Sequence, residues 1–500
     1  MFKTIKKTAL LLTILTVSIL ASCSSGTQNA DVKGPQSNTD AENGETQAEE
    51  LEEPEILPDL PDMDFGGYEF RILNTTQDAL HWMTVQLVAE EETGDVLNDE
   101  IYRRNAIIEE KYKINITETA VGGNAVGAGM GAVRDTARKS ILSDSDDYDL
   151  VMLGTAVSFD LVKQGMFVDF KGIPHIDLEK PWWDGNLIKE ITIAQKLYIA
   201  PGDFSLTHYS TTLALNFNKS LVRDHGLEDP YKLVKDNKWT IGRFFEMMKS
   251  CSADLNGDGK YDKEDLYGLA ALHFVFIPSL SVGCDMQWVE KNSEDIPVLA
   301  MDNQIFIEKM LELAENLYAG PIIFDAETEK VEHQTIVDIF EDDRALFFIE
   351  LLHHSHYFRA MEVDVGFLPH PKYDESQENY VTNIHYPTLM AVPVTSADLE
   401  RTGIVLEALC AESRARVIPA YYDKMLKTKI ARDNESEEML DIMFSTRRAD
   451  PGMVYWESQI TAPLCQLISK RDFNIASYIE KNKAKMENEI SKAVDVFTGS

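Results

Sequence analysis

The hydrophobic and polar positions of this chain alternate with two different periods, one after the other. Residues 68–73 alternate with a period of two, which indicates a β-strand. A helix is predicted after Asn98, whose side chain is expected to cap it, because one face carries residues at helical spacing: Ile101, Asn105, Ile108 and Tyr112. Strands at 114–117 and 148–154 then flank a short helix at 133–142. Strands that alternate with helices in this way predict βαβ units and a parallel sheet.

The same alternation resumes further along the chain and ends in a helical region. Strands are predicted at 212–217, 345–349, 364–368 and 389–392, and helices at 239–250 and 303–317. Asn434 and Glu437 have the spacing of a capping box and predict another helix start. The last helix is predicted from one apolar face: Ile475, Ile479, Met486, Ile490 and Val494. The pattern therefore predicts an α/β protein with a helical C-terminal region.

The N-terminus has the order of a targeting signal. Lys3, Lys6 and Lys7 precede an apolar stretch at 8–20, which is too short to span a hydrocarbon core of about 30 Å. Leu20-Ala21-Ser22-Cys23 follows, and this sequence resembles the lipobox of bacterial lipoproteins. The resemblance implies a signal peptide at 1–22 and a lipidated Cys23 that anchors the protein on the extracellular face of the cell membrane, as in Gram-positive bacteria. An ordinary secretory signal with a chance cysteine is the alternative.

Composition limits the remaining possibilities. Residues 23–64 are polar, acidic and rich in proline, which predicts a disordered tether. The net charge of -37 repels nucleic acid, so we expect no nucleic-acid partner. A chain of 500 residues with 44% hydrophobic residues can form two lobes, each with its own core. Besides Cys23, the remaining cysteines allow three complete pairings or buried free thiols: Cys251, Cys284, Cys410 and Cys465.

Several segments, in this order, resemble the extracellular solute-binding proteins of ABC transporters, of the large type that includes maltose-binding protein. The helix at 98–105 with 108–112 is similar to the first helix of that family, and 148–151 is similar to the strand that leads into its ligand cleft. Residues 340–348 resemble its F-x-x-G-x-A segment, with Asp343 where glycine is usual. Residues 365–369 and 391–393 resemble its later strands.

The resemblance implies a two-lobe fold of the periplasmic-binding-protein type (type II), in which each lobe is a mixed, mainly parallel sheet flanked by helices. It assigns 65–212 and 335–390 to the first lobe, and 213–334 and 391–500 to the second. The function implied is capture of an extracellular carbohydrate between the lobes by hinge closure and its delivery to the permease subunits of an ABC importer. A surface polysaccharide-binding protein and a surface hydrolase are the alternatives.

A carbohydrate cleft needs flat aromatic faces for sugar rings and planar polar groups for hydroxyls. Four short segments offer such side chains, at 181–184, 201–209, 383–386 and 455–456, and a fifth follows the predicted strand at 345–349. The candidate ligand-binding residues are Trp182, Trp183, Asp184, Asp203, His208, Tyr209, Glu350, His354, Asn383, His385, Tyr386 and Trp456. Core packing is the alternative for each single tryptophan or tyrosine.

Residues 254–265 have the spacing of a calcium-binding loop. Positions one, three and five carry carboxylate or amide oxygens, position six is Gly259, and position twelve is an aspartate where glutamate is usual. The expected ligands of a structural Ca²⁺ are Asp254, Asn256, Asp258, Asp265 and the carbonyl group of Lys260. An acidic turn without an ion is the alternative.

The sequence contains one histidine cluster and no catalytic signature. The cluster at 350–356 is predicted to be a loop or a helix start after the strand at 345–349, where Glu350 and His354 are candidates for contact with the solute. Binding of a transition metal is a further alternative, but the cluster lacks the His-Glu-x-x-His spacing of a helical zinc site. We find no Walker loop, G-x-S-x-G or dinucleotide motif. We therefore expect a binding protein and not an enzyme.

Overall fold

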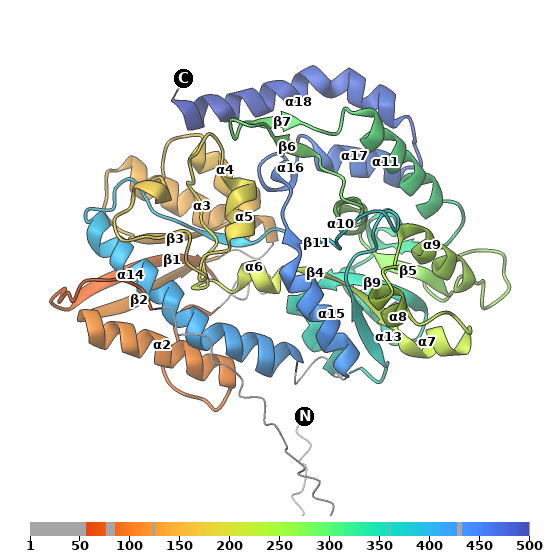
Figure 1. Cartoon of the computed structure of the whole chain (residues 1–500), viewed down its shortest axis with the longest axis horizontal. Coiled ribbons are helices and arrows are strands. Elements are labelled where there is room, and N and C mark those ends of the chain that lie inside the picture. Colours follow the sequence, from red (N-terminus) through yellow and green to blue (C-terminus); the bar gives the residue numbers. More distant parts are fainter. Residues whose placement is uncertain (1–56, 77–85, 123–125, 360, 428–432, 500) are drawn as a thin grey trace, which may run out of the picture. The chain divides into compact units, whose positions relative to one another are not determined.

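The computed structural model describes residues 57–499, except 77–85, 123–125, 360 and 428–432. Two sheets organise these residues (Figure 1). The four-stranded sheet has the order β12 (Thr388–Ala391), β3 (Leu150–Gly154), β1 (Tyr68–Thr75) and β2 (Ile114–Val121). The five-stranded sheet has the order β10 (Val365–Leu368), β4 (Leu213–Asn218), β9 (Ala345–Leu351), β5 (Tyr267–Ala271) and β8 (Ile323–Asp325). We call the parts built around these sheets the first and the second lobe.

Both sheets are mixed, as expected. In the first lobe β1 runs parallel to β2 and β3, while β12 is antiparallel to β3. In the second lobe β5 is parallel to β8 and β9, while β4 is antiparallel to β9 and β10. Two smaller ladders pair β11 (Thr382–Asn383) with β13 (Arg447–Arg448), and β6 (Val289–Lys291) with β7 (Pro297–Leu299).

Helices surround the two sheets. Those of the first half of the chain are α2 (Val96–Tyr112), α3 (Val126–Leu142), α4 (Thr155–Val162), η1 (Phe170–Gly172), α5 (Gly185–Ile191), α6 (Thr207–Ser210), α7 (Lys219–Asp224), α8 (Pro230–Lys235) and α9 (Ile241–Ser250). The next are α10 (His273–Gly283), α11 (Gln304–Leu317), α12 (Ala326–Glu329), α13 (His333–Glu341) and η2 (Leu352–Arg359). The helical C-terminal region contains α14 (Leu399–Glu412), the π-helical turns η3 (Ser413–Val417) and η4 (Ala420–Lys427), α15 (Asn434–Ser445), α16 (Pro451–Val454), α17 (Thr461–Ser469) and α18 (Ile475–Thr498).

The lobe boundaries differ from those expected from the sequence. Strands β9 and β10, which fall within 335–390, pair in the second sheet with β4. Helix α14, which falls within 391–500, packs against α2 in the first lobe. The reason is that the pairing partner of a strand is a distant part of the chain, so local alternation predicts the strand but not its sheet.

Two helix starts also differ by a residue or more from those expected. The carboxylate of Asp95, not Asn98, caps α2 by accepting the backbone N–H groups of Leu97 and Asn98. In the same way Asp433, one residue before the expected Asn434, caps α15. Aspartate and asparagine cap equally well, so a run of such residues leaves the start of a helix ambiguous.

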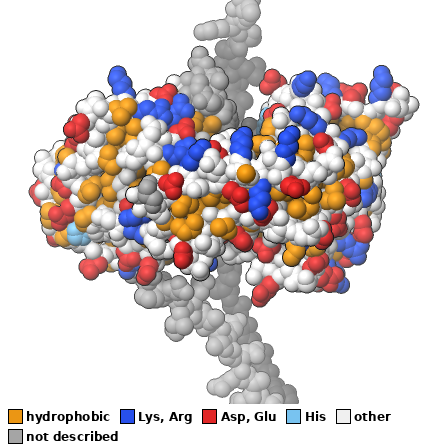
Figure 2. Space-filling model, turned by 90° about the horizontal axis from the view of Figure 1, so that it is seen from above, with side chains coloured by type: hydrophobic (Ala, Val, Ile, Leu, Met, Phe, Trp, Pro, Cys, Tyr) orange, Lys and Arg blue, Asp and Glu red, His pale blue; other side chains and the backbone are white. Residues whose placement is uncertain are grey.

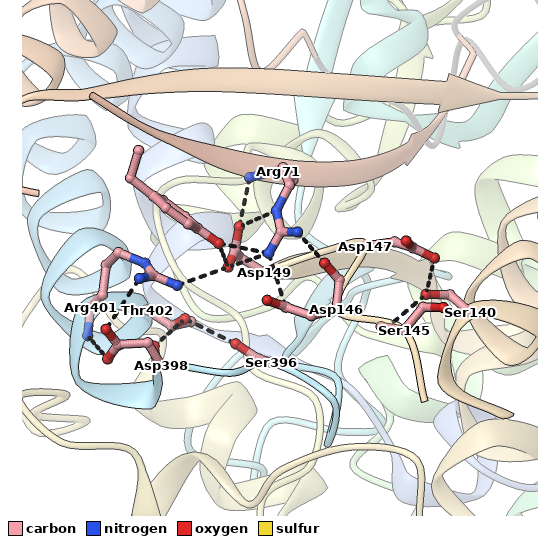
Figure 3. A network of polar contacts seen from close by, with 11 residues as sticks. Arg71, Ser140, Ser145, Asp146, Asp147, Asp149, Ser396, Asp398, Arg401 and Thr402 are labelled. Atoms are coloured by element: carbon pink, nitrogen blue, oxygen red, sulfur yellow. Dashed lines mark hydrogen bonds and ion pairs between the residues drawn. The ribbon is translucent and has the colours of Figure 1, made fainter. Parts of the chain in front are cut away.

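A polar network fastens the edge of the first sheet where β1 and β3 begin (Figure 3). The buried carboxylate of Asp149 accepts hydrogen bonds from the side chain of Arg71 at 3.0 Å and from the hydroxyl group of Tyr68 at 2.9 Å. The guanidinium group of Arg401, on α14, lies 3.4 Å from the ring centroid of Tyr68. Burial, and then Asp149, raise the pKa of Tyr68 to about 12. The network therefore joins α14 to the end of the sheet at which β1 and β3 begin. The carboxyl end of β3 lies at the opposite end of the sheet.

The four remaining cysteines, Cys251, Cys284, Cys410 and Cys465, are buried free thiols, which is one of the two interpretations left open by the sequence. The predicted signal peptide at 1–22, Cys23 and the predicted tether up to residue 56 lie outside the described residues. The end of the predicted tether at 57–64 is part of the folded chain instead, because Leu60 packs against the core. In the part of the chain that the structure describes, we find no helix with the length and apolar character needed to cross a membrane. Figure 2 shows one face of the molecule, on which Lys and Arg side chains lie among acidic and apolar ones.

Candidate functional site

A cavity of about 460 Å³ lies at the ends of the second-lobe strands. It is lined by Leu272, Phe274, Val275, His333, Glu350, Leu351, His354, His385, Tyr386, Glu457 and Ala462. A smaller pocket shares Phe274, His385 and Tyr386 with this cavity and extends to Thr155, the residue that follows β3 of the first lobe. The two spaces together therefore have walls from both lobes.

The elements that carry these side chains explain why they meet. Strand β9 is buried throughout and brings Glu350 to its carboxyl end. Helix α10 begins two residues after the parallel strand β5, and its first turn supplies Phe274 to the same edge. Ligands of α/β sheets bind outside the carboxyl ends of the strands, so the cavity lies where this architecture places a site.

The segments that join the lobes form another wall. Thr212 and Ile384 form a β-bridge, and the backbone N–H group of His385 donates to the carbonyl group of Thr211 at 2.9 Å. Tyr386 has a φ of 51°, in the left-handed region that a bulky residue seldom occupies. Strain of this kind persists where the surrounding structure fixes the backbone, and it is concentrated at functional sites.

The carboxylate of Glu350 lies in the cavity wall and contacts two histidines. Its Oε2 accepts from Nε2 of His333 at 2.5 Å, and its Oε1 lies 2.9 Å from Nδ1 of His354. Burial favours the protonated acid, but the hydrogen bonds from the two histidines outweigh it and hold the pKa of Glu350 well below its usual range. The same contact raises the pKa of His333 against the effect of burial. The carboxylate is therefore ionised and held in one orientation.

Two further titratable side chains, those of His385 and Glu457, line the cavity. Burial lowers the pKa of His385 to about 4, and among the described residues its Nδ1 atom has no hydrogen-bond partner. Burial raises the pKa of Glu457 to about 7. Such groups can bond the hydroxyl groups of a ligand, because an unmet buried polar atom is costly until a partner arrives.

The raised pKa of Glu457 predicts a pH dependence of stability. The unfolded glutamate has a pKa of about 4.3, so between that pH and about 7 the folded chain holds a proton that the unfolded chain has lost. The contribution of this group to the free energy of unfolding is therefore full below about pH 4.3 and falls as the pH rises to about 7. We expect Glu457→Gln to flatten the decline in stability between pH 5 and pH 8 in urea unfolding. Glu315→Gln, at an exposed position of α11, should keep the slope of the wild-type protein.

The structure brings four of the sequence-predicted residues together at the cavity: Glu350, His354, His385 and Tyr386. It places Trp182 and Trp183 in the core of the first lobe, where both indole N–H groups donate to the buried carboxylate of Glu407 at 3.0 and 2.9 Å. Trp456 is also buried, and its indole donates to the carbonyl group of Glu489. The indole N–H groups of these three rings thus have their polar partners in the protein interior, and none of the three rings lines the cavity.

The other predicted residues lie in buried contacts near the segments that join the lobes. Asp184 forms an ion pair with Arg447 at 3.0 Å. Asp203 accepts from the hydroxyl group of Tyr209 at 3.0 Å, and His208 is fully buried beside them. Asn383 is buried in the ladder of β11 with β13. None of these residues lines the cavity.

The sequence interpretation missed most of the lining residues, among them Thr155, Phe274, His333 and Glu457. His333 is 17 residues before Glu350 and belongs to another element, so no spacing rule links the two. Glu457 directly follows Tyr455 and Trp456, a pair considered for the cleft. Its position next to this pair could therefore have indicated that it lines the cavity.

The loop at 254–265 adopts the sharp turn that its pattern predicts. Gly259 has a φ of 77°, and Asp254 accepts the backbone N–H groups of Gly257 and Gly259. The buried Asp265 accepts those of Leu255 and Asp262. The carboxylates thus hold the loop backbone in a turn, and its ion binding stays a prediction.

Comparison with known proteins identifies the fold. No protein-family model and no curated protein sequence matches the chain. A solved cyclo/maltodextrin-binding protein in complex with maltotetraose is similar, with a TM-score of 0.53, 14% identity and coverage of 86% of this chain and 96% of that one. An ABC substrate-binding protein from Listeria monocytogenes in complex with cycloalternan has a TM-score of 0.53, 10% identity and coverage of 87% and 99%. UgpB from Mycobacterium tuberculosis, in complex with glycerophosphocholine, has a TM-score of 0.53, 10% identity and coverage of 86% and 99%. The chain therefore has the two-lobe fold of solute-binding proteins.

Proposed function

We propose that this protein is the solute receptor of an ABC importer and that it captures a carbohydrate by closure of its two lobes. The observation that carries the proposal is the cavity lined by Phe274 and Tyr386 together with hydrogen-bonding side chains, next to a smaller pocket that shares these two residues and reaches Thr155 of the first lobe. Aromatic rings suit the apolar faces of a sugar, and fixed polar groups suit its hydroxyls. Two similar structures contain oligosaccharides, which supports the same ligand class.

The N-terminal sequence supports the location of this receptor. Cys23 would carry the acyl chains, and the segment that follows it, up to residue 56, would serve as a tether that leaves the lobes free on the extracellular face. The permease subunits of the importer would then receive the loaded, closed form. Metabolic labelling with a radioactive fatty acid tests the anchor: we expect label on the wild-type chain and none on the variant Cys23→Ser.

A thermal-shift screen against mono- and oligosaccharides tests the function on the chain from Ser24 onward. A ligand at 100 times its dissociation constant should add about 2.7 kcal/mol to the free energy of unfolding. Phe274→Ala should weaken the binding of the sugar that responds by about tenfold, because a stacked ring contributes about 1 kcal/mol or more. Phe473→Ala, outside the cavity, should leave the affinity unchanged.

Small-angle scattering with that sugar separates the alternatives. Contraction on binding and recovery of the sugar chemically unchanged would support a transport receptor. Retention on an insoluble glycan without contraction would favour a surface polysaccharide-binding protein. Cleavage of the sugar would favour a hydrolase and would contradict the proposal that the protein is not an enzyme.

The loop at 254–265 is proposed to bind a structural Ca²⁺ with the affinity of an extracellular module, about 0.1–1 mM. At 10 mM Ca²⁺ the free energy of unfolding should therefore rise by about 1.4–2.7 kcal/mol over that in EDTA, because the ion binds the folded chain. Urea unfolding measures the gain, and Asp258→Ala should abolish it. Asp224→Ala, at an exposed helix end, is the control and should retain it. Equal stability of the wild-type protein in Ca²⁺ and in EDTA would contradict the site.

A further inference from the structure

Three side chains of the cavity wall have the donor set and the proximity of a metal site. We propose that His333, Glu350 and His354 bind one divalent transition-metal ion, and that Zn²⁺ fits them best. Each offers one ligand atom, and these atoms lie within 4.8 Å of one another. This is the one such group of three found among the described residues. The proposal concerns the cavity itself and does not depend on which solute the protein carries.

The geometry of the two imidazoles fits one ion. Nε2 of His333 and Nδ1 of His354 both point at the carboxylate of Glu350, one at each oxygen. The ring centroids of the two histidines are 5.6 Å apart. Two imidazoles on a tetrahedral zinc, at a Zn–N distance of about 2.0–2.1 Å, would place their centroids about 5 Å apart. The separation of the two rings is therefore close to that of two imidazoles on one zinc ion.

The chemistry of the donors selects the class of ion. Two imidazoles and one carboxylate suit zinc and its neighbours in the transition series, whereas Ca²⁺ and Mg²⁺ prefer shells made of oxygen. Metal ligands bind in their deprotonated forms, and the Glu350 carboxylate already faces both imidazole nitrogens. The ion would take the place of the protons that the histidines now share with this carboxylate.

The surroundings hold two of the three ligands in place. The side chains of Glu350 and His354 are only 9% and 8% exposed, and Oε1 of Glu350 also accepts the backbone N–H group of Leu351 at 2.8 Å. His333 lies on the first turn of α13, and with 35% of its side chain exposed it is the most accessible of the three ligands. Contacts of this kind orient ligands before the ion arrives.

Three protein ligands leave the fourth position of a tetrahedral zinc open. Because all three residues line the same cavity, that position faces the space in which the solute would lie. A water molecule or an oxygen of the solute can complete the shell. The site is thus of the open kind and differs from a closed structural zinc site, which uses four protein ligands.

Isothermal titration of the chain from Ser24, freed of any histidine tag and first treated with EDTA, tests the proposal with ZnCl₂. We expect one Zn²⁺ bound per chain. His333→Ala should weaken this binding at least tenfold, and because His333 is the most exposed of the three it should leave the fold intact. His175→Ala is the matched control, since this histidine lies on the first lobe beside Glu400 at 3.6 Å and away from the cavity.

Cobalt provides a second readout that does not depend on heat. Co²⁺ should give the visible absorption of a tetrahedral site in the wild-type protein and in His175→Ala, and lose it in Glu350→Gln and His333→Ala. Absence of Zn²⁺ binding, or binding with unchanged affinity in His333→Ala, would overturn the proposal. Sugar binding measured in EDTA is a separate experiment, so failure of the solute proposal and failure of the metal proposal give different results.

Discussion

Replacing Arg447 by alanine should lower the free energy of unfolding by about 3–5 kcal/mol, because it leaves a buried carboxylate without its partner. The guanidinium group pairs with Asp184 at 3.0 Å, and the two side chains are only 8% and 7% exposed. It also lies 4.1 Å from the ring centroid of Tyr209 and donates to the carbonyl group of His208. Burial would raise the pKa of Asp184, and Arg447, followed by His208, overrides it and lowers that pKa.

Urea unfolding of the chain from Ser24 measures this loss, and the neighbouring arginine supplies the control. Arg448 pairs with Glu190 and Asp285 but is 20% exposed, so Arg448→Ala should cost about 1 kcal/mol or less. The double variant Asp184→Asn with Arg447→Ala should recover part of the loss, because the buried charge is then gone. Equal costs for the two arginines would contradict the importance of this ion pair.

Arg447 lies where the segments that join the two lobes meet the first lobe. It belongs to β13, which pairs with β11 in the connecting segment, while Asp184 caps α5 of the first lobe. The ion pair thus fastens the connecting strands to the first lobe. Asp184 is a candidate ligand-binding residue in the sequence, and in the structure it stabilises the connection between the lobes instead.

Much of the fold could be predicted from local pattern. The strands at 68–73 and 114–117 became β1 and β2, and the spacing of the last helix gave α18, because short-range periodicity records which face of an element is buried. The assignment of β9 and β10 to a sheet could not be predicted, because it depends on partners far along the chain. The two-lobe fold came from the order of several motifs, and the similar solved structures confirm it.

One departure from the family pattern has a physical explanation. Asp343 stands where glycine is usual, and its φ of 56° is in the left-handed region that glycine favours. Aspartate tolerates this region better than most residues, and its Oδ1 accepts from the side chain of Asn218 at 2.5 Å. The backbone conformation is therefore the one that a glycine would take, although the side chain differs.

The candidate site was predictable only in part. Glu350 and His354 could be found because they directly follow a predicted strand, the place where this architecture exposes side chains. The sequence could not distinguish a core tryptophan from a tryptophan of the cleft. Trp182 is identified as a core residue by its hydrogen bond to Glu407, which is more than 200 residues away along the chain. His333 was hidden for the same reason.

Introducing a methyl group at Gly403 should destabilise the first lobe by about 2–3 kcal/mol, the upper range for overpacking a core. A Cβ atom built there would lie 1.9 Å from the backbone carbonyl oxygen of Pro174 and 3.0 Å from a methyl group of Ile173. A backbone oxygen cannot rotate away, so α14 must shift from the segment it covers. The helix propensity of alanine returns only about 1 kcal/mol.

Gly185→Ala is the matched control, because Gly185 also lies in a helix and a Cβ atom there meets nothing within 4 Å. It should be neutral or stabilise the chain by up to about 1 kcal/mol. Urea unfolding followed by tryptophan fluorescence measures both variants, and it also reports on Trp182 and Trp183, whose shared partner Glu407 lies one helical turn after Gly403. A shift of α14 should therefore change the native emission of Gly403→Ala as well as its stability. Unchanged emission and stability would show that α14 does not need this close approach, and would contradict the packing of the first lobe.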